Sequence, residues 1–297
     1  MQLKKLKTEK PNRASSNLDA MSALEMATLM NREDAAVPRA INRVLPQVAR
    51  AIDIIAERLG RGGRLFYVGT GTSGRIGALD AVEIPPTFGI SPGMIQFVIA
   101  GGERALAHAT EASEDSITLG RKDMAARKPT KKDIVVGIAA SGRTPYTIGA
   151  MEYAGSKGAA TIAVVCNKGS VMAGMAQAAI EVDVGHEVLT GSTRLKAGTA
   201  EKLICNMIST GAMARLGFVY GNLMVNLRPK NKKLFERAVS IVEDVAGVDR
   251  EVAARTLKSA GLQVPVALVM LKANVSKTEA ARRLKRTGGI VRKALRG

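Results

Sequence analysis

Apolar and polar residues follow one another along the chain in short blocks that predict strands and helices in turn. Five apolar runs, each bounded by turn-forming residues, predict buried strands at 64–69, 94–102, 132–142, 160–169 and 179–185. Apolar positions at helical spacing predict helices before and between these strands, at 38–60, 74–82, 103–126, 145–158 and 170–178. Strands that alternate with helices form parallel sheets, and strands that are apolar on both faces indicate a sheet covered on both sides.

This pattern predicts an α/β fold, a three-layer αβα sandwich with a five-stranded parallel sheet over residues 55–217. An N-terminal arm and helix, residues 1–54, precede it. Residues 193–217 are expected to form a long helix that is rich in Ala and Met. After the polar stretch "NLRPKNKK", helical spacing at 231–246, 250–260, 263–272 and 276–287 predicts a small C-terminal helical domain over residues 228–297.

Composition and charge narrow the class of protein. We expect no membrane partner, because no apolar run reaches 18 residues. We expect a cytoplasmic protein, because the N-terminus lacks a signal pattern. Cys166 and Cys205 also fit buried thiols in a reducing compartment. The net charge of +18 is concentrated at the ends, since residues 228–297 alone hold 17 Lys or Arg and six acidic residues. Aromatic residues do not interleave with these basic ones, so we interpret them as a solvated surface and expect no nucleic-acid partner.

The first predicted strand runs into "GTGTSG", residues 69–74, which has the spacing G-x-G-x-x-G. Glycines before a helix let an anion approach the free N–H groups of the first turn. A dinucleotide site also needs an acidic residue about 20 residues further on, to bind the ribose. The second strand ends "VIAGGE", and Glu103 lies 29 residues past Gly74. The loop therefore favours a different phosphate ligand.

Hydroxyl groups are the chemistry that two such loops share. "LFYVGTGTSGR" and "IVVGIAASGRT" both run from a strand through small residues and Ser-Gly-Arg into a helix, and their serines, Ser73 and Ser141, are 68 positions apart. Thr70, Thr72 and Thr144 add further hydroxyls. Hydroxyls together with backbone N–H groups suit a phosphomonoester. We expect both loops to face one ligand at the carboxyl ends of the strands.

Longer motifs carry a family resemblance. "GTGTSGR" and "GIAASGRTPY" resemble the sugar isomerase (SIS) domain, which binds phosphosugars. "DAVEIPPTFG", "EASEDS", "EVLTGSTRLKAGTAEKL" and "STGAMARLGFVYGNLMV" are similar to the N-acetylmuramic acid 6-phosphate etherase family. This resemblance implies a carbon–oxygen lyase that cleaves the D-lactyl ether of N-acetylmuramic acid 6-phosphate in cell-wall sugar recycling. It also implies a homodimer that uses neither a cofactor nor a metal.

The resemblance assigns two catalytic carboxyls. Glu83 of "DAVEIPPTFG" is expected to protonate the leaving lactate, and Glu114 of "EASEDS" to remove the proton from C2 of the sugar. We expect Pro85 and Pro86 to end the helix after Glu83 and so to keep Glu83 near the first loop. Glu114 falls on the helical stretch after the second strand.

The remaining site residues are expected to bind the substrate. The phosphate contacts are assigned to Thr72, Ser73, Ser141, Gly142 and Thr144. The segment "HEVLTGSTRLKAG", from the same or the partner subunit, is expected to contribute donors and acceptors to the sugar from Glu187, Ser192, Thr193 and Lys196.

Two alternatives remain open on the sequence. A non-catalytic phosphosugar-sensing SIS regulator, like the glucokinase regulatory protein, would keep the hydroxyl loops and dispense with the two glutamates. The presence of both Glu83 and Glu114 favours the enzyme. The other alternative is an aldose–ketose isomerase of the same fold.

Overall fold

The computed structural model describes residues 6–108, 113–227, 229 and 231–296. The chain divides into two compact units, the first combining Met1–Val82 with Pro92–Ser209 and the second combining Glu83–Ser91 with Thr210–Gly297. Each unit has its own apolar core. Among the described residues, no helix has the length and apolarity needed to cross a membrane.

The first unit contains a five-stranded sheet in the order β2-β1-β3-β4-β5. All neighbouring strands pair in parallel, and the register places Tyr67 of β1 between Phe97 of β2 and Val136 of β3. The predicted α/β sandwich with its five-stranded parallel sheet is therefore confirmed. The strands are β1 (Leu65–Gly69), β2 (Ile95–Ile99), β3 (Ile134–Ile138), β4 (Ala160–Val165) and β5 (Ala178–Glu181).

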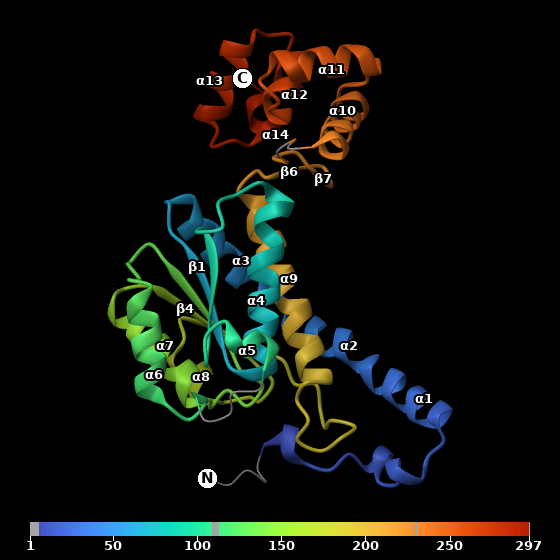
Figure 1. The fold of residues 1–297 in the computed structure, drawn as a ribbon, viewed down its shortest axis with the longest axis vertical. Coiled ribbons are helices and arrows are strands. Elements are labelled where there is room, and N and C mark those ends of the chain that lie inside the picture. The colour runs from blue at the N-terminus through green and yellow to red at the C-terminus, as the bar shows by residue number, and fades with distance from the viewer. Residues whose placement is uncertain (1–5, 109–112, 228, 230, 297) are drawn as a thin grey trace. The chain divides into compact units, whose positions relative to one another are not determined.

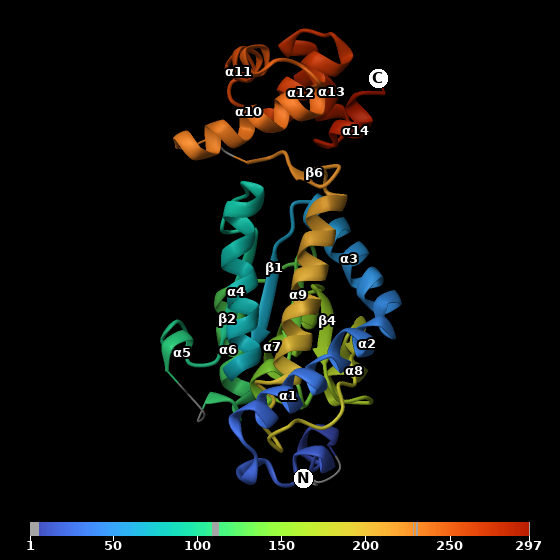
Figure 2. The same ribbon diagram turned by 90° about the vertical axis from the view of Figure 1, so that its right-hand side faces the viewer.

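Helices cover both faces of this sheet, as Figure 1 shows. One face carries α6 (Ile117–Ala126), α7 (Pro145–Ser156) and α8 (Val171–Met175). On the other face lie α3 (Leu45–Gly60), α4 (Gly71–Phe88) and α9 (Lys196–Arg215), side by side in front of the strands in Figure 2. Alternate side chains of β1 serve the two layers, because successive residues of a strand point to opposite faces.

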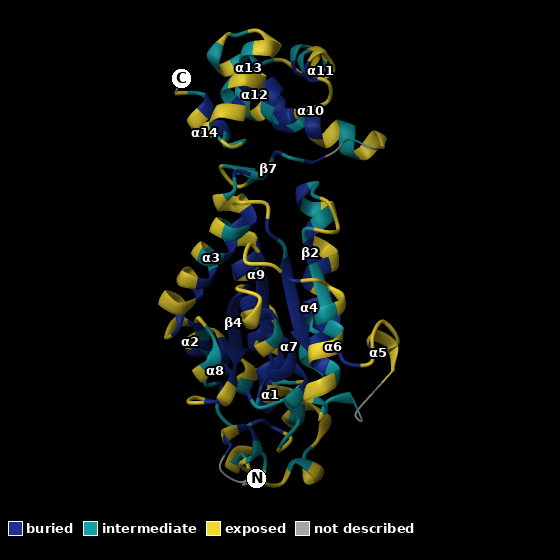
Figure 3. Ribbon diagram, turned by 90° about the vertical axis from the view of Figure 1, so that its left-hand side faces the viewer, coloured by how far each residue is buried: buried dark blue, intermediate teal, exposed yellow. Residues whose placement is uncertain are grey.

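The strands are apolar on both faces because both faces are covered. Phe66 and Val68 of β1 belong to the core cluster that includes Tyr146 and Met151 of α7. The intervening Tyr67 points the other way and its hydroxyl donates a hydrogen bond of 2.8 Å to Asp80 of α4. Every residue of β1, β3 and β4 is buried, and β4 lies within the dark blue core of Figure 3.

The N-terminal segment is more regular than its sequence pattern predicts. It forms three short 3₁₀ helices, η2 (Lys7–Glu9), η3 (Arg13–Ser15) and η4 (Leu18–Ala20), and then α1 (Ala23–Asp34) and α2 (Ala36–Asn42). Ser22 and Glu25 form a capping box at the start of α1. The single helix expected over 38–60 is instead α2 followed by α3, because the chain leaves helical geometry at Val44 and restarts with Pro46 in the first turn of α3.

Two helices after the first strands differ from the prediction. The helix expected over 74–82 is α4, which begins at Gly71 and continues to Phe88 with Pro85 and Pro86 inside it. Pro85 and Pro86 lie in the last turn, where their missing N–H groups leave the carbonyls of Ala81 and Val82 without helical partners. The helix expected over 103–126 is replaced by α5 (Arg104–Ala107) and α6, and residues 109–112 lie outside the described residues.

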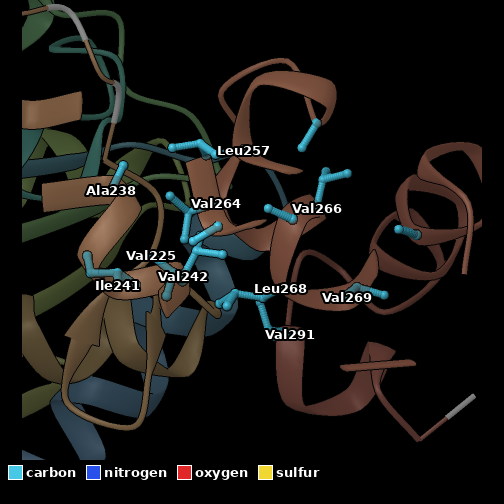
Figure 4. Close-up of a cluster of buried hydrophobic side chains, with 14 of the residues drawn as sticks. Val225, Ala238, Ile241, Val242, Leu257, Val264, Val266, Leu268, Val269 and Val291 are labelled. Carbon is cyan, nitrogen blue, oxygen red and sulfur yellow. The ribbon is translucent and has the colours of Figure 1, made fainter. Parts of the chain in front are cut away.

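The second unit packs its helices around a central apolar one. α12 (Val264–Ala273) contacts each of the four other helices of the C-terminal region. Its side chains Val264 and Leu268 lie in one apolar cluster with Val242 and Val291 in Figure 4. A two-stranded antiparallel hairpin, β6 (Val219–Tyr220) and β7 (Leu223–Met224), precedes these helices and was not expected. The predicted helical C-terminal region is confirmed, and its other helices are α10 (Lys232–Ala246), α11 (Arg250–Ser259), α13 (Lys277–Arg286) and α14 (Val291–Ala294).

The contact between α6 and α7 depends on glycine. A Cβ added at Gly149 of α7 would lie 2.2 Å from the carbonyl oxygen of Ile117, and one added at Gly120 of α6 would lie 2.0 Å from that of Tyr146. Backbone cannot yield at such distances without moving a whole helix.

Gly149→Ala should therefore lower the free energy of unfolding by about 2–3 kcal/mol through overpacking. Gly155 is the matched control in the same helix, because a Cβ there would meet only Thr161 Cγ2 at 3.8 Å. Gly155→Ala should raise the stability by about 0.5–1 kcal/mol, through helix propensity alone. Urea unfolding of both variants tests this, and equal stabilities would contradict the proposed close contact.

Candidate functional site

A cavity of about 360 Å³ lies at the carboxyl ends of β1 and β3. These strands are neighbours in the sheet. The strand that follows β1 in the chain, β2, pairs with one edge of β1, and β3 pairs with its other edge. Such a point, where the strand order reverses, is where α/β sheets bind ligands. Among the described residues that line it, seven carry hydroxyl groups, namely Thr8, Thr70, Thr72, Ser73, Ser141, Thr144 and Thr193.

The loop from β1 into α4 forms one wall of the cavity. Gly71 has a positive φ of 50°, which a residue with a side chain rarely adopts, and α4 starts there. Thr72 and Ser73 lie in the first turn of α4, where backbone N–H groups have no partner within the helix. Arg75 also lines the cavity, and its guanidinium donates to the carbonyls of Ala105 and His108.

The loop from β3 into α7 forms the facing wall. Ser141 and Thr144 line the cavity, and Thr144 is the N-cap of α7, whose first helical residue is Pro145. The backbone N–H of Arg143 donates to Ser141 Oγ over 3.2 Å. The cavity therefore receives the N-terminal ends of α4 and α7, and two helix dipoles favour an anion there. The predicted meeting of the two hydroxyl loops is present in the structure.

The N-terminal segment closes the cavity, which the sequence pattern did not predict. Thr8 and Glu9 of η2 line it together with Gly191 and Thr193 from the loop before α9. Asn167 fixes this segment, because its side chain accepts from the Lys7 backbone N–H, bonds to Thr8 Oγ1 and donates to the Ala140 carbonyl. Nothing in the sequence marks Glu9 as part of a site, because it is a single glutamate within a basic segment.

Glu114 lies in this cavity, in a turn before α6 rather than on the predicted helix. Its Oε1 atom is so close to Gly71 that a Cβ on that glycine would be 3.2 Å away. The carbonyl of Glu114 accepts the backbone N–H of Tyr146 over 3.0 Å, which ties the turn to α7. The carboxyl of Glu114 is thus held beside the first turn of α4.

Glu83 is not among the residues that line the cavity. Helix α4 continues through Pro85 and Pro86, so the expectation that these two prolines end the helix after Glu83 is wrong. The side chain of Glu83 is exposed, and beside it on the same helix the apolar Leu79 and Val82 are 52% and 59% exposed. The expected role of Glu83 at the site stays a prediction.

Four other predicted binding residues do not line the cavity either: Gly142, Glu187, Ser192 and Lys196. Glu187 is fully buried and accepts the backbone N–H groups of Lys196 and Ala197 over 3.0 and 2.9 Å, so it caps α9. The Lys196 ammonium is 3% exposed and pairs with Glu33 of α1 over 2.7 Å. Both side chains thus have structural partners, while Thr193 alone of that segment's predicted residues reaches the cavity.

The chain resembles named proteins over almost its whole length. It is 52% identical over 295 residues to the N-acetylmuramic acid 6-phosphate etherase of Burkholderia lata. The aligned region covers 99% of this chain and 97% of that protein. The etherases of Clostridium beijerinckii and Escherichia coli O1:K1 are each 49% identical, again over 99% of this chain and over 97% and 99% of theirs. The chain belongs to the N-acetylmuramic acid 6-phosphate etherase family.

Profiles of smaller domains agree with this family. The SIS domain matches residues 118–208, the glucokinase regulatory protein N-terminal SIS domain matches 47–155, and the C-terminal lid domain of glucokinase regulatory protein matches 221–263. A solved phosphoheptose isomerase from Francisella tularensis has a TM-score of 0.50 at 19% identity and covers 64% of this chain and all of its own. At that identity the likeness supports the fold alone.

The etherase-family chain has one further carboxyl at this site that the sequence pattern missed. Glu201 of α9 is 1% exposed and lies behind the wall of the cavity, with Oε1 3.0 Å from Ser73 Oγ. Burial raises the pKa of Glu201 to about 8, the hydrogen bond with Ser73 acts against this rise, and the charge of Glu187 adds to it. Within the described part of the chain, no cluster of three or more His, Cys, Asp or Glu side chains is arranged to hold a metal ion.

This pKa makes the stability of the fold depend on pH. Between the ordinary value of 4.5 and about 8, native Glu201 keeps a proton that the unfolded chain releases, so stability falls as the pH rises through that range. Glu201→Gln removes the effect. The free energy of unfolding of the variant, minus that of the wild type, should increase by several kcal/mol from about pH 5 to about pH 8.5, at about 1.4 kcal/mol per pKa unit. Urea unfolding at both pH values measures this, and an equal difference at both would refute the raised pKa.

Proposed function

We propose that the chain is a carbon–oxygen lyase that converts N-acetylmuramic acid 6-phosphate into N-acetylglucosamine 6-phosphate and D-lactate, within cell-wall amino-sugar recycling. The observation that carries the proposal is its near 50% identity, over 99% of its length, to proteins named for this one activity. A cavity with seven hydroxyl-bearing residues and two helix N-termini supports it, because these groups suit a phosphomonoester.

The phosphate is proposed to bind between the two loops. Thr72 and Ser73 contact it from α4, and Ser141 and Thr144 contact it from the loop before α7. Gly142 gives the second loop its shape, with a positive φ of 65° and no room for a Cβ, which would lie 2.3 Å from Ser170 Oγ. The hydroxyl groups and the two helix dipoles stabilise the phosphate dianion, and Arg75 adds a positive charge at the cavity.

The chemistry proposed for the sugar is an elimination followed by addition of water. When the ring opens, C1 becomes an aldehyde and the hydrogen on C2 becomes acidic. Glu114 takes that proton as a general base, the electron pair forms the C2–C3 double bond, and the lactyl oxygen leaves C3 with a proton from a general acid. Water then adds across the double bond and gives N-acetylglucosamine 6-phosphate. Glu114 is suited to the base because its carboxyl lies in the cavity.

The general acid is proposed to be Glu83 from a second copy of the chain. Glu83 is not among the residues that line the cavity, and it is an exposed residue of α4, as are Leu79 and Val82. Apolar side chains that are more than half exposed on one helix face suit a contact with another copy. A homodimer built on this face brings Glu83 of each copy to the cavity of the other.

The activity is tested by incubating the pure protein with N-acetylmuramic acid 6-phosphate and measuring D-lactate. The wild type should release lactate, whereas Glu83→Gln and Glu114→Gln should each lower kcat by at least about a hundredfold, since one proton-transfer group is worth that much. Asp115→Asn is the control for Glu114, as an exposed neighbour, and should remain active. Binding of the phosphosugar without release of lactate would instead favour the phosphosugar-sensing regulator.

A mixing experiment tests whether the two glutamates come from different chains. In a heterodimer of Glu83→Gln with Glu114→Gln, one cavity then holds both wild-type glutamates and the other holds neither. Random assembly makes half of the dimers mixed, so the mixture should recover about a quarter of the wild-type activity. Failure to recover activity in confirmed heterodimers would mean that Glu83 and Glu114 act within one chain and would contradict the proposed exchange. Full activity of Glu83→Gln would instead remove Glu83 and make Glu9, the other carboxyl among the described lining residues, the candidate acid.

A further inference from the structure

Glu201 is buried directly behind a residue of the phosphate loop. Its Oε1 atom lies within hydrogen-bond distance of Ser73 Oγ, and its Oε2 atom is buried with no hydrogen-bond partner among the described residues. Glu201 does not line the cavity, whereas Ser73 does. A buried carboxyl with one oxygen unpartnered is costly to retain as a charge, so its place behind Ser73 calls for a chemical reason.

Close packing of α9 against the start of α4 makes this contact possible. A Cβ on Gly198 would lie 3.3 Å from Thr72 Cγ2, so the absence of a side chain lets the two helices approach at the level of the loop. Glu201 stands one turn further along α9 and points its carboxyl at Ser73. The geometry of the Ser73 hydroxyl is therefore set from α9 as well as from its own helix.

The number of protons on this pair decides what Ser73 can do. A serine hydroxyl has one proton to donate, and the oxygens of a phosphate dianion only accept. If Glu201 is ionised, it accepts a hydrogen bond from the Ser73 hydroxyl, and Ser73 then presents only lone pairs to the phosphate. If Glu201 is neutral, it donates its own proton to Ser73 Oγ and the Ser73 proton is free. We propose that Glu201 is a positioning residue that, as a neutral carboxyl, turns the Ser73 hydroxyl toward the phosphoryl group of the ligand.

The surroundings of Glu201 favour the neutral form. Burial raises its pKa to about 8, and the charge of Glu187, the cap of α9, acts in the same direction. The other titratable side chains that interact with it are the buried thiols of Cys166 and Cys205, whose pKa values are also raised by burial, well above their usual 9.0. Neither thiol carries a charge near neutral pH, so neither holds Glu201 in its ionised form.

A neutral Glu201 also accounts for the unpartnered oxygen. If Oε1 carries the proton that goes to Ser73, then Oε2 is an uncharged carbonyl oxygen. An unpaired carbonyl costs far less free energy than half of a buried charge. The arrangement gives Ser73 a fixed donor behind it, and the ligand meets a hydroxyl that already points outward.

The test is the affinity for N-acetylglucosamine 6-phosphate, measured by calorimetry at about pH 7 and about pH 9, where the phosphate is a dianion throughout. If only the protonated form binds, a pKa near 8 predicts that wild-type affinity falls by about tenfold over this interval. Glu201→Gln keeps a permanent donor with the same shape, so its affinity should match the wild type at about pH 7 and stay level at about pH 9. Ser73→Ala should bind more weakly and without this pH dependence.

Glu57→Gln, at an exposed site on α3, is the control and should retain the wild-type profile. A wild-type affinity that does not change with pH would overturn the role of Glu201, and so would an equal fall in Glu201→Gln. The inference rests on the proposed function for the identity of its ligand. A wild type that binds no phosphosugar at either pH would contradict that function instead, so the two failures are distinct.

Discussion

The parallel pairing of β1 with β3 is the constraint on which the site depends. Gly69 at the end of β1 pairs in register with Ile138 at the end of β3, so the two loops that follow start from the same level of the sheet. Two serines that are 68 positions apart in the chain thus face one cavity, together with the first turns of α4 and α7. A shift of this register would separate the hydroxyls and leave no common anion site.

Hydroxyl groups and the N-terminal ends of two helices line the cavity beside the charged side chains of Glu9, Arg75 and Glu114. Helix N-termini and hydroxyl groups attract a phosphate without neutralising the carboxyls that chemistry at a sugar carbon needs close by. Behind the first loop, burial suppresses the charge of Glu201, so a third carboxyl contributes hydrogen bonding rather than repulsion of the phosphate. Burial therefore separates the roles of Glu201 and Glu114, two glutamates that sequence composition cannot tell apart.

Local rules predicted most of the fold and part of the site. Apolar runs bounded by turns gave the five strands, and glycine and hydroxyl residues after the first and third strands gave the two loops. Single residues were less predictable: Pro85 and Pro86 suggested an end to α4, but the helix accommodates both prolines and continues to Phe88. Glu9 could not be found at all, because its approach to the cavity depends on Asn167, more than 150 positions away.

By itself, the amino-acid sequence determined the alternation of strands and helices, the chemistry of the two loops and the family, because each is written in contiguous residues or in their periodicity. Only the tertiary structure decided which carboxyls share the cavity, which serve as helix caps and ion pairs, and which lies neutral behind Ser73. These roles depend on burial and on distances between side chains of separate elements. Such distances follow from how α9, α4 and the N-terminal segment pack together, and no local pattern specifies that packing.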